Sequence, residues 1–472
     1  MTGPEVAPGG VALGTATGRW LLTATVLASG MAFLDATAVQ VALPTLGRDL
    51  GASLPDLQWV LNGYTLPLAA LILLGGSLGD RYGRRRVFVI GVAWFAVASL
   101  LCGLAQTPGQ LIAARALQGI GGALLTPGSL SLIQSSFRSA DRPRAIGVWS
   151  ALSGVAPLVG PFLGGALIDL VSWRLVFLLN LPLAAVVVAV AARHVPESRA
   201  PGDHGRFDIA GAVLGAVALG ALTYALITAG ADRGSAVAVV VAAVVAVAAG
   251  VWFVVRELHV PDPMLPPRLF ADRQFTGANL TTLAVYGGLG GSGLFLVLQL
   301  QSALGYTATA AGAATLPTIL LITLLSPRAG ALAQRIGPRL PMSAGPLTVA
   351  VGTLLLVGVD GGAPYWVEVL PGSVLQGLGM ALTVAPLTAS VLSAAPDTLT
   401  GVASGVNNAV ARAAQLLVVA ALPVAVGLSG ADYARPEAFT DGYRLAMLAC
   451  AGLFAVGGAV AWATIRNDLL RD

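Results

Sequence analysis

The chain has 472 residues, of which 56% are hydrophobic and 10% are charged, and its mean hydropathy is +0.83. An ordinary soluble domain carries about 25% charged residues, so this composition excludes a soluble protein and indicates one that lies in a lipid bilayer. The formal net charge is +4, and all 26 basic residues are Arg. Both cysteines lie in apolar runs, which argues against a disulfide framework.

Three classes of activity find no support in the sequence. There is no G-x-x-x-x-G-K-[ST] phosphate loop, so transport driven by ATP is disfavoured. The histidines, His194, His204 and His259, fall in polar segments and form no cluster, so we expect no metal site. No nucleophile–base set is present, so we expect neither an enzyme nor a bound cofactor.

Fourteen apolar runs follow one another, each long enough for a spanning helix, which needs about 20 residues. Polar stretches at residues 194–206 and 257–273 divide them. The first run is too long for a signal peptide and contains Asp35, so we expect it to be retained. The predicted spans lie at residues 19–43, 56–79, 87–105, 109–134, 143–168, 173–193, 207–229, 235–256, 274–302, 309–332, 338–359, 364–392, 400–428 and 442–464.

Asp35 lies deep in the first predicted span, whereas the other carboxylates lie in loops or near helix ends. A charge at that depth costs at least about 2.5–3.5 kcal/mol to insert, so a functional role is the default hypothesis. A carboxylate that burial and a nearby cation pull in opposite directions can exchange a proton as its surroundings change. We therefore predict proton coupling or cation binding at Asp35. The alternative is a static salt bridge between helices.

Other polar residues are predicted at the depth of Asp35. Arg115 in the fourth span is its expected partner, because the two lie roughly 13 and 9 Å below the outer edge at 1.5 Å per residue. Asn62 in the second span and Gln118 in the fourth fall in the same layer. Four polar groups on three helices predict a lined cavity. The alternative is that Arg115 snorkels to the outer surface.

The loop after the second span reads Gly76-Ser-Leu-Gly-Asp-Arg-Tyr-Gly-Arg-Arg85. Its glycines, Gly76 and Gly83 included, allow a tight turn and close approach of helices. Asp80 can pair with Arg81, Arg85 or a neighbouring helix end. We predict a conformational latch here. The alternative is a plain anchor of positive charge on the cytoplasmic side.

The fifth span contains a cluster of glycine and proline. Proline removes a backbone donor and glycine lets helices touch, so we expect this helix to bend or slide at the interface between two halves. The cluster consists of Pro157, Gly160, Pro161, Gly164 and Gly165.

Polar residues also occur in the later spans. They either line the cavity or simply bond helices together, and the sequence leaves both readings open. The candidates for cavity lining are Asn279, Tyr286 and Gln301 in the ninth span, Gln376 in the twelfth, and Asn408 and Arg412 in the thirteenth.

The chain repeats itself. The loop of residues 76–85 recurs at residues 330–339, an offset of 254, and residues 117–124 recur at residues 375–382, an offset of 258. Parallel repeats that rock about a central site are typical of transporters. We therefore predict an all-α membrane protein with two six-helix bundles and two inserted helices. Its domains are residues 1–193, a linker with the inserted helices at residues 194–273, and residues 274–472.

The placement of Arg predicts the orientation. With both termini cytoplasmic, 19 Arg lie on cytoplasmic segments and five on outer loops, and two lie within spans. This asymmetry explains the pI near 9.4 as membrane topology, so we expect no nucleic-acid partner. The Ala, Val, Gly and Leu bias suggests a bacterial gene, and we expect a monomer in the bacterial cell (inner) membrane. The five outer Arg are Arg48, Arg174, Arg233, Arg435 and Arg444.

Together these segments resemble the major facilitator superfamily, and within it the fourteen-helix drug:proton antiporters. Residues 76–85 resemble the superfamily's loop motif, although the second copy has Gln334 in place of Asp. Residues 34–44 resemble the first-helix motif, with Gln40 where Asn is usual. Residues 115–119 resemble the fourth-helix motif tied to proton transfer.

Two further segments carry the same resemblance. Residues 160–165 resemble the antiporter motif of the fifth helix, with Ala156 in place of an expected Gly, and residues 172–182 resemble the entry to the sixth helix. The resemblance covers nearly the whole chain. It implies export of small lipophilic, often cationic compounds such as drugs or antibiotics, with protons entering in exchange and membrane lipid around the protein.

Within that resemblance, Asp35 binds the proton or senses a cation, and Arg115 biases its protonation. Three other functions are alternatives, and of these lipid export remains open. A lipid exporter fits the fold, because apolar cavities accept acyl chains. The antiporter pattern of the fifth span argues against a nutrient importer. A receptor or scaffold without transport has no need of the Asp35–Arg115 pair.

Overall fold

The protein is described by a computed structural model that covers residues 10–199, 208–231, 234–362, 364–396, 399–429 and 435–467. Within these ranges, fourteen helical segments are long and apolar enough to cross a membrane, which confirms the predicted spans. Part of the first polar stretch, with His204 and Arg206, and the loop residue Arg233 lie outside the described residues.

The first six spans form one bundle. Capping sets where three of its helices begin, because the hydroxyls of Thr15, Ser53 and Thr107 each accept a backbone N–H of the first turn. Short turns at Gly154 and Leu179 split the fifth and sixth spans. The helices are α1 (Ala16–Leu50), α2 (Leu54–Tyr82), α3 (Arg84–Leu104), α4 (Pro108–Ser136), α5 (Arg142–Ser153), α6 (Val155–Leu170), α7 (Arg174–Leu178) and α8 (Asn180–His194).

The last six spans form a second bundle, and two helices precede it. The inserted helices are α9 (Ile209–Ala229) and α10 (Ala236–His259). The second bundle contains η1 (Pro267–Ala271), α11 (Arg273–Leu298), the π-helical turn η2 (Gln299–Ala303), α12 (Ala308–Ala314), α13 (Leu316–Ile336), α14 (Arg339–Leu355), η3 (Leu356–Gly358), α15 (Tyr365–Glu368), α16 (Leu370–Ser393), α17 (Thr400–Ala425) and α18 (Pro436–Thr464).

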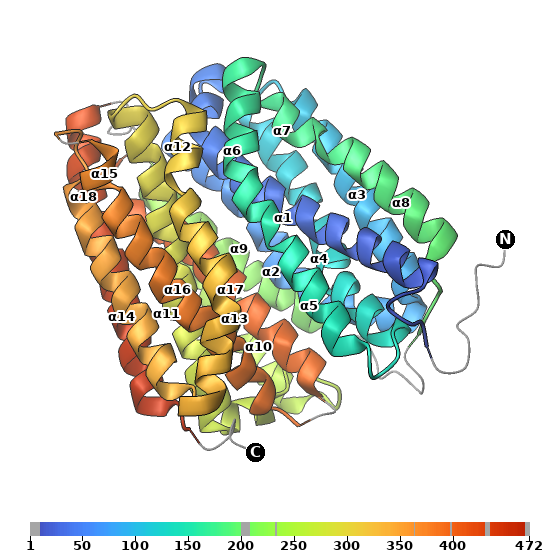
Figure 1. The fold of residues 1–472 in the computed structure, drawn as a ribbon. Helices are drawn as coiled ribbons and strands as arrows, with labels where there is room; N and C mark the ends of the chain where they lie inside the picture. Colours follow the sequence, from blue (N-terminus) through green and yellow to red (C-terminus); the bar gives the residue numbers. More distant parts are fainter. Residues whose placement is uncertain are drawn as a thin grey trace.

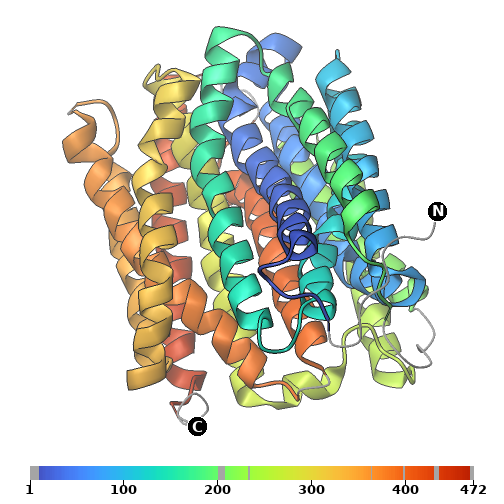
Figure 2. The ribbon, with the colours of Figure 1, turned by 45° about the vertical axis from the view of Figure 1, so that its right-hand side comes forward.

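The two bundles stand side by side, blue to green and yellow to red in Figure 1. They meet along two helix pairs, α2 with α17 and α6 with α12. Figure 2 shows α6 beside the yellow α12 near the top of the view. The inserted α9 packs against α10, α2 and α17, so it covers one seam between the bundles. This arrangement confirms the predicted fold of two six-helix bundles and two inserted helices; the domain limits at residues 193 and 273 stay a prediction.

The ends of the molecule can be named from the chain path. After fourteen crossings, the start of α1 and the end of α18 lie at the same end, which we call the termini end, and the opposite end is the far end. The largest apolar cluster lies toward the far end and draws side chains from both bundles, including Leu57 and Phe295. Toward the termini end the core divides into one cluster around Phe88 in the first bundle and another around Phe275 in the second. The bundles are therefore packed together mainly at the far end.

Candidate functional site

Asp35 lies in the middle of α1 with no solvent exposure. Its Oδ2 accepts a hydrogen bond from Arg115 Nη1 of α4 at 2.6 Å, and Arg115 is itself only 1% exposed. The pair expected from the sequence is therefore formed. Because both charges are buried, loss of one partner leaves the other uncompensated, which costs about 3–5 kcal/mol in comparable sites.

Two side-chain amides complete the surroundings of Asp35. Gln118 Nε2 donates to Asp35 Oδ1 at 2.8 Å, and Asn180 Nδ2 donates to the same oxygen at 3.0 Å. Both amides also donate to the hydroxyl of Ser99, at 2.8 and 3.2 Å. Asn180 and Ser99 are not among the site residues predicted from the sequence. The segment of residues 172–182, noted as a motif, contained the signal for Asn180.

Arg115 points into the first bundle and does not snorkel to the surface. Its Nη1 also donates to Gln118 Oε1 at 2.6 Å, and its Nε donates to the carbonyl of Val60 at 3.1 Å. The guanidinium lies 4.4 Å from the ring centre of Tyr64 and 5.8 Å from that of Phe177. Aromatic faces attract a desolvated cation, so these rings help to hold Arg115 in place.

This network suits a charged Asp35. An ionised carboxylate only accepts hydrogen bonds, and three donors point at it. A protonated Asp35 would place an O–H where donors already stand, so one of them would have to turn away. All members of the network belong to the first bundle, on α1, α2, α3, α4 and α8. The arrangement can therefore register a change in the charge of Asp35 as a change in helix contacts.

Asn62 lies apart from this network. It is 1% exposed on α2, and its Nδ2 has no hydrogen-bond partner among the described residues. One turn away, Gln58 Nε2 donates to the carbonyl of Val419 on α17 at 2.7 Å. The same polar face of α2 thus reaches the second bundle.

In the second bundle, the polar cluster forms around Asn407. Its Nδ2 donates to Thr282 Oγ1 at 2.7 Å and to Asn279 Oδ1 at 3.2 Å, which joins α17 to α11. The predicted neighbour Asn408 is exposed and donates only to the carbonyl of Ser404. Sequence spacing alone could not tell which of the two adjacent asparagines faces α11.

Gln376 and Gln301 both bond helices together. Gln376 Nε2 donates to Thr353 Oγ1 at 3.0 Å, between α16 and α14. In the second bundle, this contact is the counterpart of the one between Gln118 and Ser99 in the first bundle. Gln301 Nε2 donates to the carbonyl of Val41 at 2.9 Å and so joins the second bundle to α1.

The loop motif forms a connected set of ion pairs and caps at the termini end. Arg84 Nη2 lies 2.8 Å from Asp80 Oδ1. The carboxylate of Glu197, which follows α8, accepts the backbone N–H groups of Arg85 and Arg86 at 3.0 and 3.2 Å. Glu197 therefore caps α3, and sequence analysis missed it. The structure thus ties this loop to residues that follow α8, within the first bundle.

Gly83 is required where the loop turns. Its φ is +111°, a conformation that disfavours residues with a side chain, and a Cβ there would lie 2.8 Å from the carboxylate of Glu197. Gly337, its counterpart in the repeat, has φ +90° and faces Asn467, whose Oδ1 accepts the N–H of Arg339. The remaining predicted latch residues pack locally. Gly76 lies near Pro127 of α4, and the guanidinium of Arg81 lies 5.8 Å from the Tyr82 ring.

The glycine and proline cluster of α6 lies between the bundles. Gly160 and Gly164 pack closely on α1 of the same bundle. Gly165 faces the backbone of α12, and Gly312 of α12 faces the carbonyl of Pro161. Pro157 lies one turn earlier on the same helix. A side chain at Gly165 or Gly312 would therefore separate the two bundles here.

Hydrogen bonds between the bundles, as far as the described residues give them, all lie toward the far end. Asp169 at the end of α6 accepts the N–H groups of Ala308 and Thr309 at 3.1 and 2.8 Å. The bonds from Gln58 and Gln301 lie in the same part of the molecule. The bundles are therefore held closed at the far end.

These two halves and the motifs within them match a known family. The sequence model of the Major Facilitator Superfamily matches residues 25–419 and, a second time, residues 278–469. The chain belongs to the Major Facilitator Superfamily. The second match falls on the second bundle, which agrees with the internal repeat.

Several curated relatives are named as resistance proteins. The chain is 37% identical over 389 residues to the multidrug resistance protein Stp of Mycobacterium tuberculosis, covering 82% of this chain and 72% of that protein. It is 34% identical to the methylenomycin A resistance protein of Bacillus subtilis, covering 95% and 94% of the two chains. It is 36% identical to the puromycin resistance protein pur8 of Streptomyces alboniger, covering 94% and 91%. The expected resemblance to drug exporters of this superfamily is confirmed, and the chain is a multi-pass bacterial membrane protein.

Solved structures share the superfamily fold. A bacterial homologue of the human lysosomal transporter Spinster aligns with a TM-score of 0.67 at 17% identity, covering 95% of this chain and 97% of that one. The POT family transporter PepTSo aligns with a TM-score of 0.67 at 16% identity, covering 94% of this chain and 97% of that one.

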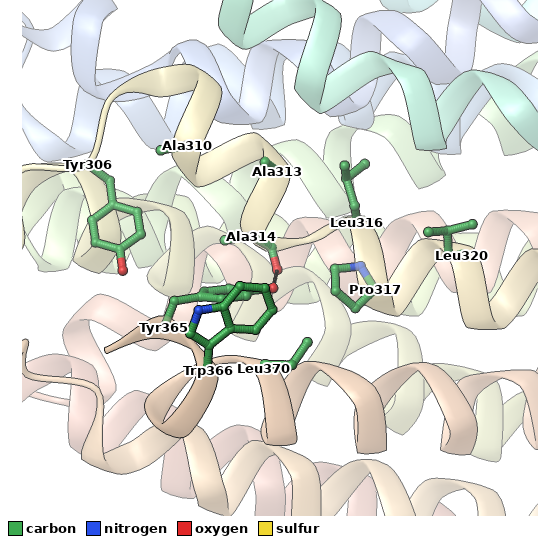
Figure 3. Close-up of a pocket in the computed structure, with 10 residues that line it drawn as sticks. All are labelled: Tyr306, Ala310, Ala313, Ala314, Leu316, Pro317, Leu320, Tyr365, Trp366 and Leu370. Atoms are coloured by element: carbon green, nitrogen blue, oxygen red, sulfur yellow. Dashed lines mark hydrogen bonds between the residues drawn. The ribbon is translucent and has the colours of Figure 1, made fainter. Parts of the chain in front are cut away.

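A groove of about 470 Å³ lies on this superfamily fold away from the predicted site residues. It runs between α12 and α13 on one side and α15 and α16 on the other, near the far end. Figure 3 shows the rings of Tyr365 and Trp366 facing Ala314 and Pro317. Trp366 is 71% exposed, as expected of aromatic residues at the level of a membrane interface.

Proposed function

We propose that this chain exports small lipophilic compounds, drugs or antibiotics among them, in exchange for protons by alternating access. The observation that carries the proposal is the buried Asp35–Arg115 pair with its two amide donors. A buried carboxylate held by movable donors can bind and release a proton, and a membrane scaffold has no need of one. The resistance proteins among the relatives support the same direction of transport.

The orientation follows from the Arg distribution, which favours both termini in the cytoplasm. The termini end then faces the cytoplasm, and the far end faces outward. In this orientation the packing described above corresponds to a state that is closed to the outside. A substrate would enter from the cytoplasm or the inner leaflet and leave after the far-end contacts have opened.

The proton would act through Asp35. When Asp35 is charged, Arg115, Gln118 and Asn180 hold α1, α4 and α8 together. Protonation removes the ionic attraction to Arg115 and displaces a donor, so these contacts weaken. The Gly and Pro cluster of α6, at the seam with α12, would then allow the bundles to slide. The loop of residues 76–85, with Glu197, would stabilise the termini end of the first bundle in one state.

The proposal is tested with purified protein in liposomes under an imposed pH gradient. Proton flux is followed while candidate drugs and antibiotics are added, for the wild type, Asp35→Asn and the control Asp441→Asn, whose side chain is 79% exposed. We expect substrate-driven proton flux in the wild type and the control and its loss in Asp35→Asn. Unchanged flux in Asp35→Asn would remove the role assigned to Asp35.

A lipid exporter of the same fold is the second candidate, because the groove beside Trp366 is lined by apolar side chains and tyrosines. Fluorescent phospholipid in the same liposomes separates the two functions. Movement of the lipid between leaflets, with no proton flux for any drug, would favour lipid export. No transport of either kind would favour a receptor or scaffold.

A further inference from the structure

Arg412 is a charge at the centre of the membrane-spanning region. It lies 12 residues after the start of α17 (Thr400) and 13 before its end (Ala425), so each end of the helix is roughly 18–20 Å away at 1.5 Å per residue. An Arg side chain cannot snorkel over that distance, so the guanidinium must find its partners inside the protein.

Among the described residues, no carboxylate forms an ion pair with Arg412. Its one hydrogen-bond partner within the described ranges is Gln415 Oε1 at 3.4 Å. Asp35 is the single carboxylate of the sequence that lies far from a helix end or loop, and Arg115 already occupies it. Because that pair is neutral overall, the middle of the membrane carries one net positive charge, at Arg412.

Arg412 stands on a helix that lies where the two bundles meet. α17 packs against α2 of the first bundle and α11 of the second, and Gln415 contacts Gly290 of α11. Arg412 itself is half-buried on this helix. The charge therefore stands on a helix that both halves contact, as alternating access requires of a substrate site.

We propose that Arg412 binds the acidic group of the substrate, a carboxylate or a phenolate, so that the transporter prefers lipophilic acids to lipophilic cations. The proposal rests on the export function above and replaces the wider expectation of cationic compounds. A guanidinium without a carboxylate partner attracts an oxyanion, because it supplies two parallel N–H donors that match a carboxylate. A cation at the same place would meet uncompensated repulsion.

The test compares two probes with the same aromatic body and opposite charge, 1-pyrenebutyric acid and 1-pyrenebutylamine. Their binding to purified full-length protein is measured by fluorescence for the wild type, Arg412→Gln, Arg412→Lys and the exposed control Arg444→Gln. We expect the wild type and the control to bind the acid about tenfold or more tightly than the amine, a typical contribution of a charge-assisted bond. Arg412→Gln should lose this preference, and Arg412→Lys should keep part of it.

Three results would overturn the proposal: no binding of the acid by the wild type, tighter binding of the amine, or an equal loss of both probes in Arg412→Gln while Arg412→Lys restores neither. The proposed function fails in a different way. If Asp35→Asn and the wild type share the acid preference but neither exchanges protons, the Arg412 site stands without antiport. If proton exchange is driven by cations and survives Arg412→Gln, antiport stands and the Arg412 site does not.

Discussion

At the scale of single residues, Asn180 is one of the side chains that hold the carboxylate of Asp35 in place. It donates one of the three hydrogen bonds that Asp35 accepts, while its own Oδ1 has no partner among the described residues. Rotation of the amide would present that oxygen to a protonated Asp35. Asn180 also begins α8, directly after the turn at Leu179, so a changed contact reaches the sixth span.

We expect Asn180→Ala to move the pH profile of proton exchange toward higher pH, because the charged carboxylate loses a donor that is worth about 1.5–3 kcal/mol. The initial rate of substrate-driven proton flux in liposomes, measured from pH 5.5 to 8.5, checks this. Gln110→Ala, which removes an exposed amide, is the control. A lower rate with an unmoved pH profile would mean that Asn180 only supports the fold.

The residues that could be predicted best from the sequence are the charged ones, because burying a charge in a membrane costs much free energy. Asp35 and Arg115 could be predicted because a charge in lipid demands a partner, and their depths along two helices already matched. Asn180, Ser99 and Asn407 could not, because amides and hydroxyls are common in spans and helical periodicity does not fix the direction of a side chain within a packed bundle. The choice between Asn407 and Asn408 shows that limit.

The same reasoning applies to Arg412. Its depth is visible from the sequence, but only the folded chain shows that Arg115 holds Asp35 and that Gln415 is the one hydrogen-bond partner of Arg412 among the described residues.

At the scale of elements, the spans and their order were predictable from apolar length, but their breaks were not. The turns at Gly154 and Leu179 occur inside continuous apolar runs. The caps Glu197 and Asn467 lie after the helices of each bundle, so only the folded chain brings them to α3 and α14. The two halves therefore resemble each other beyond the repeated sequence motifs: each has a capping side chain at the equivalent helix, a carboxylate in the first half and an amide in the second.

Gly83→Ala tests the turn between α2 and α3. An alanine at this position would have to keep an unfavourable positive φ, and its Cβ would press on the carboxylate of Glu197. We therefore expect the protein to lose about 1–3 kcal/mol of stability. The melting temperature of the purified protein should fall. Gly109→Ala is the matched control, since its Cβ would contact nothing within 4 Å. Equal melting temperatures for the two variants would contradict the strain assigned to Gly83.

The inserted helices carry a pH-sensitive contact at the termini end. Burial raises the pKa of Asp208, but the Gly211 amide and the guanidinium of Arg256 outweigh it and hold the pKa below its usual value. Arg256 Nε lies 2.6 Å from Asp208 Oδ1, which joins α10 to the start of α9. Because the folded pKa is lowered, this stabilisation is fully present above the ordinary value of 3.8 and is lost as pH falls through the lower folded value.

We therefore expect Asp208→Asn to lower the melting temperature at pH 7 and to have little effect at the lowest pH that the protein tolerates. Melting curves between pH 3 and 7 check this, with Asp441→Asn as the exposed control. A difference between wild type and Asp208→Asn that grows on acidification would contradict the assigned sign.

At the scale of the whole molecule, the proposed transport requires the contacts at the far end to open. Asp169 and the backbone of α12 join the bundles there, beside the close contact of α6 with α12. Cross-linking Asp169→Cys to Thr309→Cys with a short thiol-specific reagent should stop substrate-driven proton flux, and reductant should restore it. The native cysteines are both buried and so should react slowly.

The matched control joins two residues of one bundle, Ser135→Cys and Ser198→Cys, whose hydroxyls lie 2.9 Å apart in the native chain. That cross-link constrains no movement between the bundles, so we expect the flux to survive it. Flux that continues after complete cross-linking of residues 169 and 309 would mean that the far end does not open during transport. The bundles would then have to exchange substrate by a route that leaves α6 and α12 together, and the sliding role of the α6 cluster would have to be abandoned.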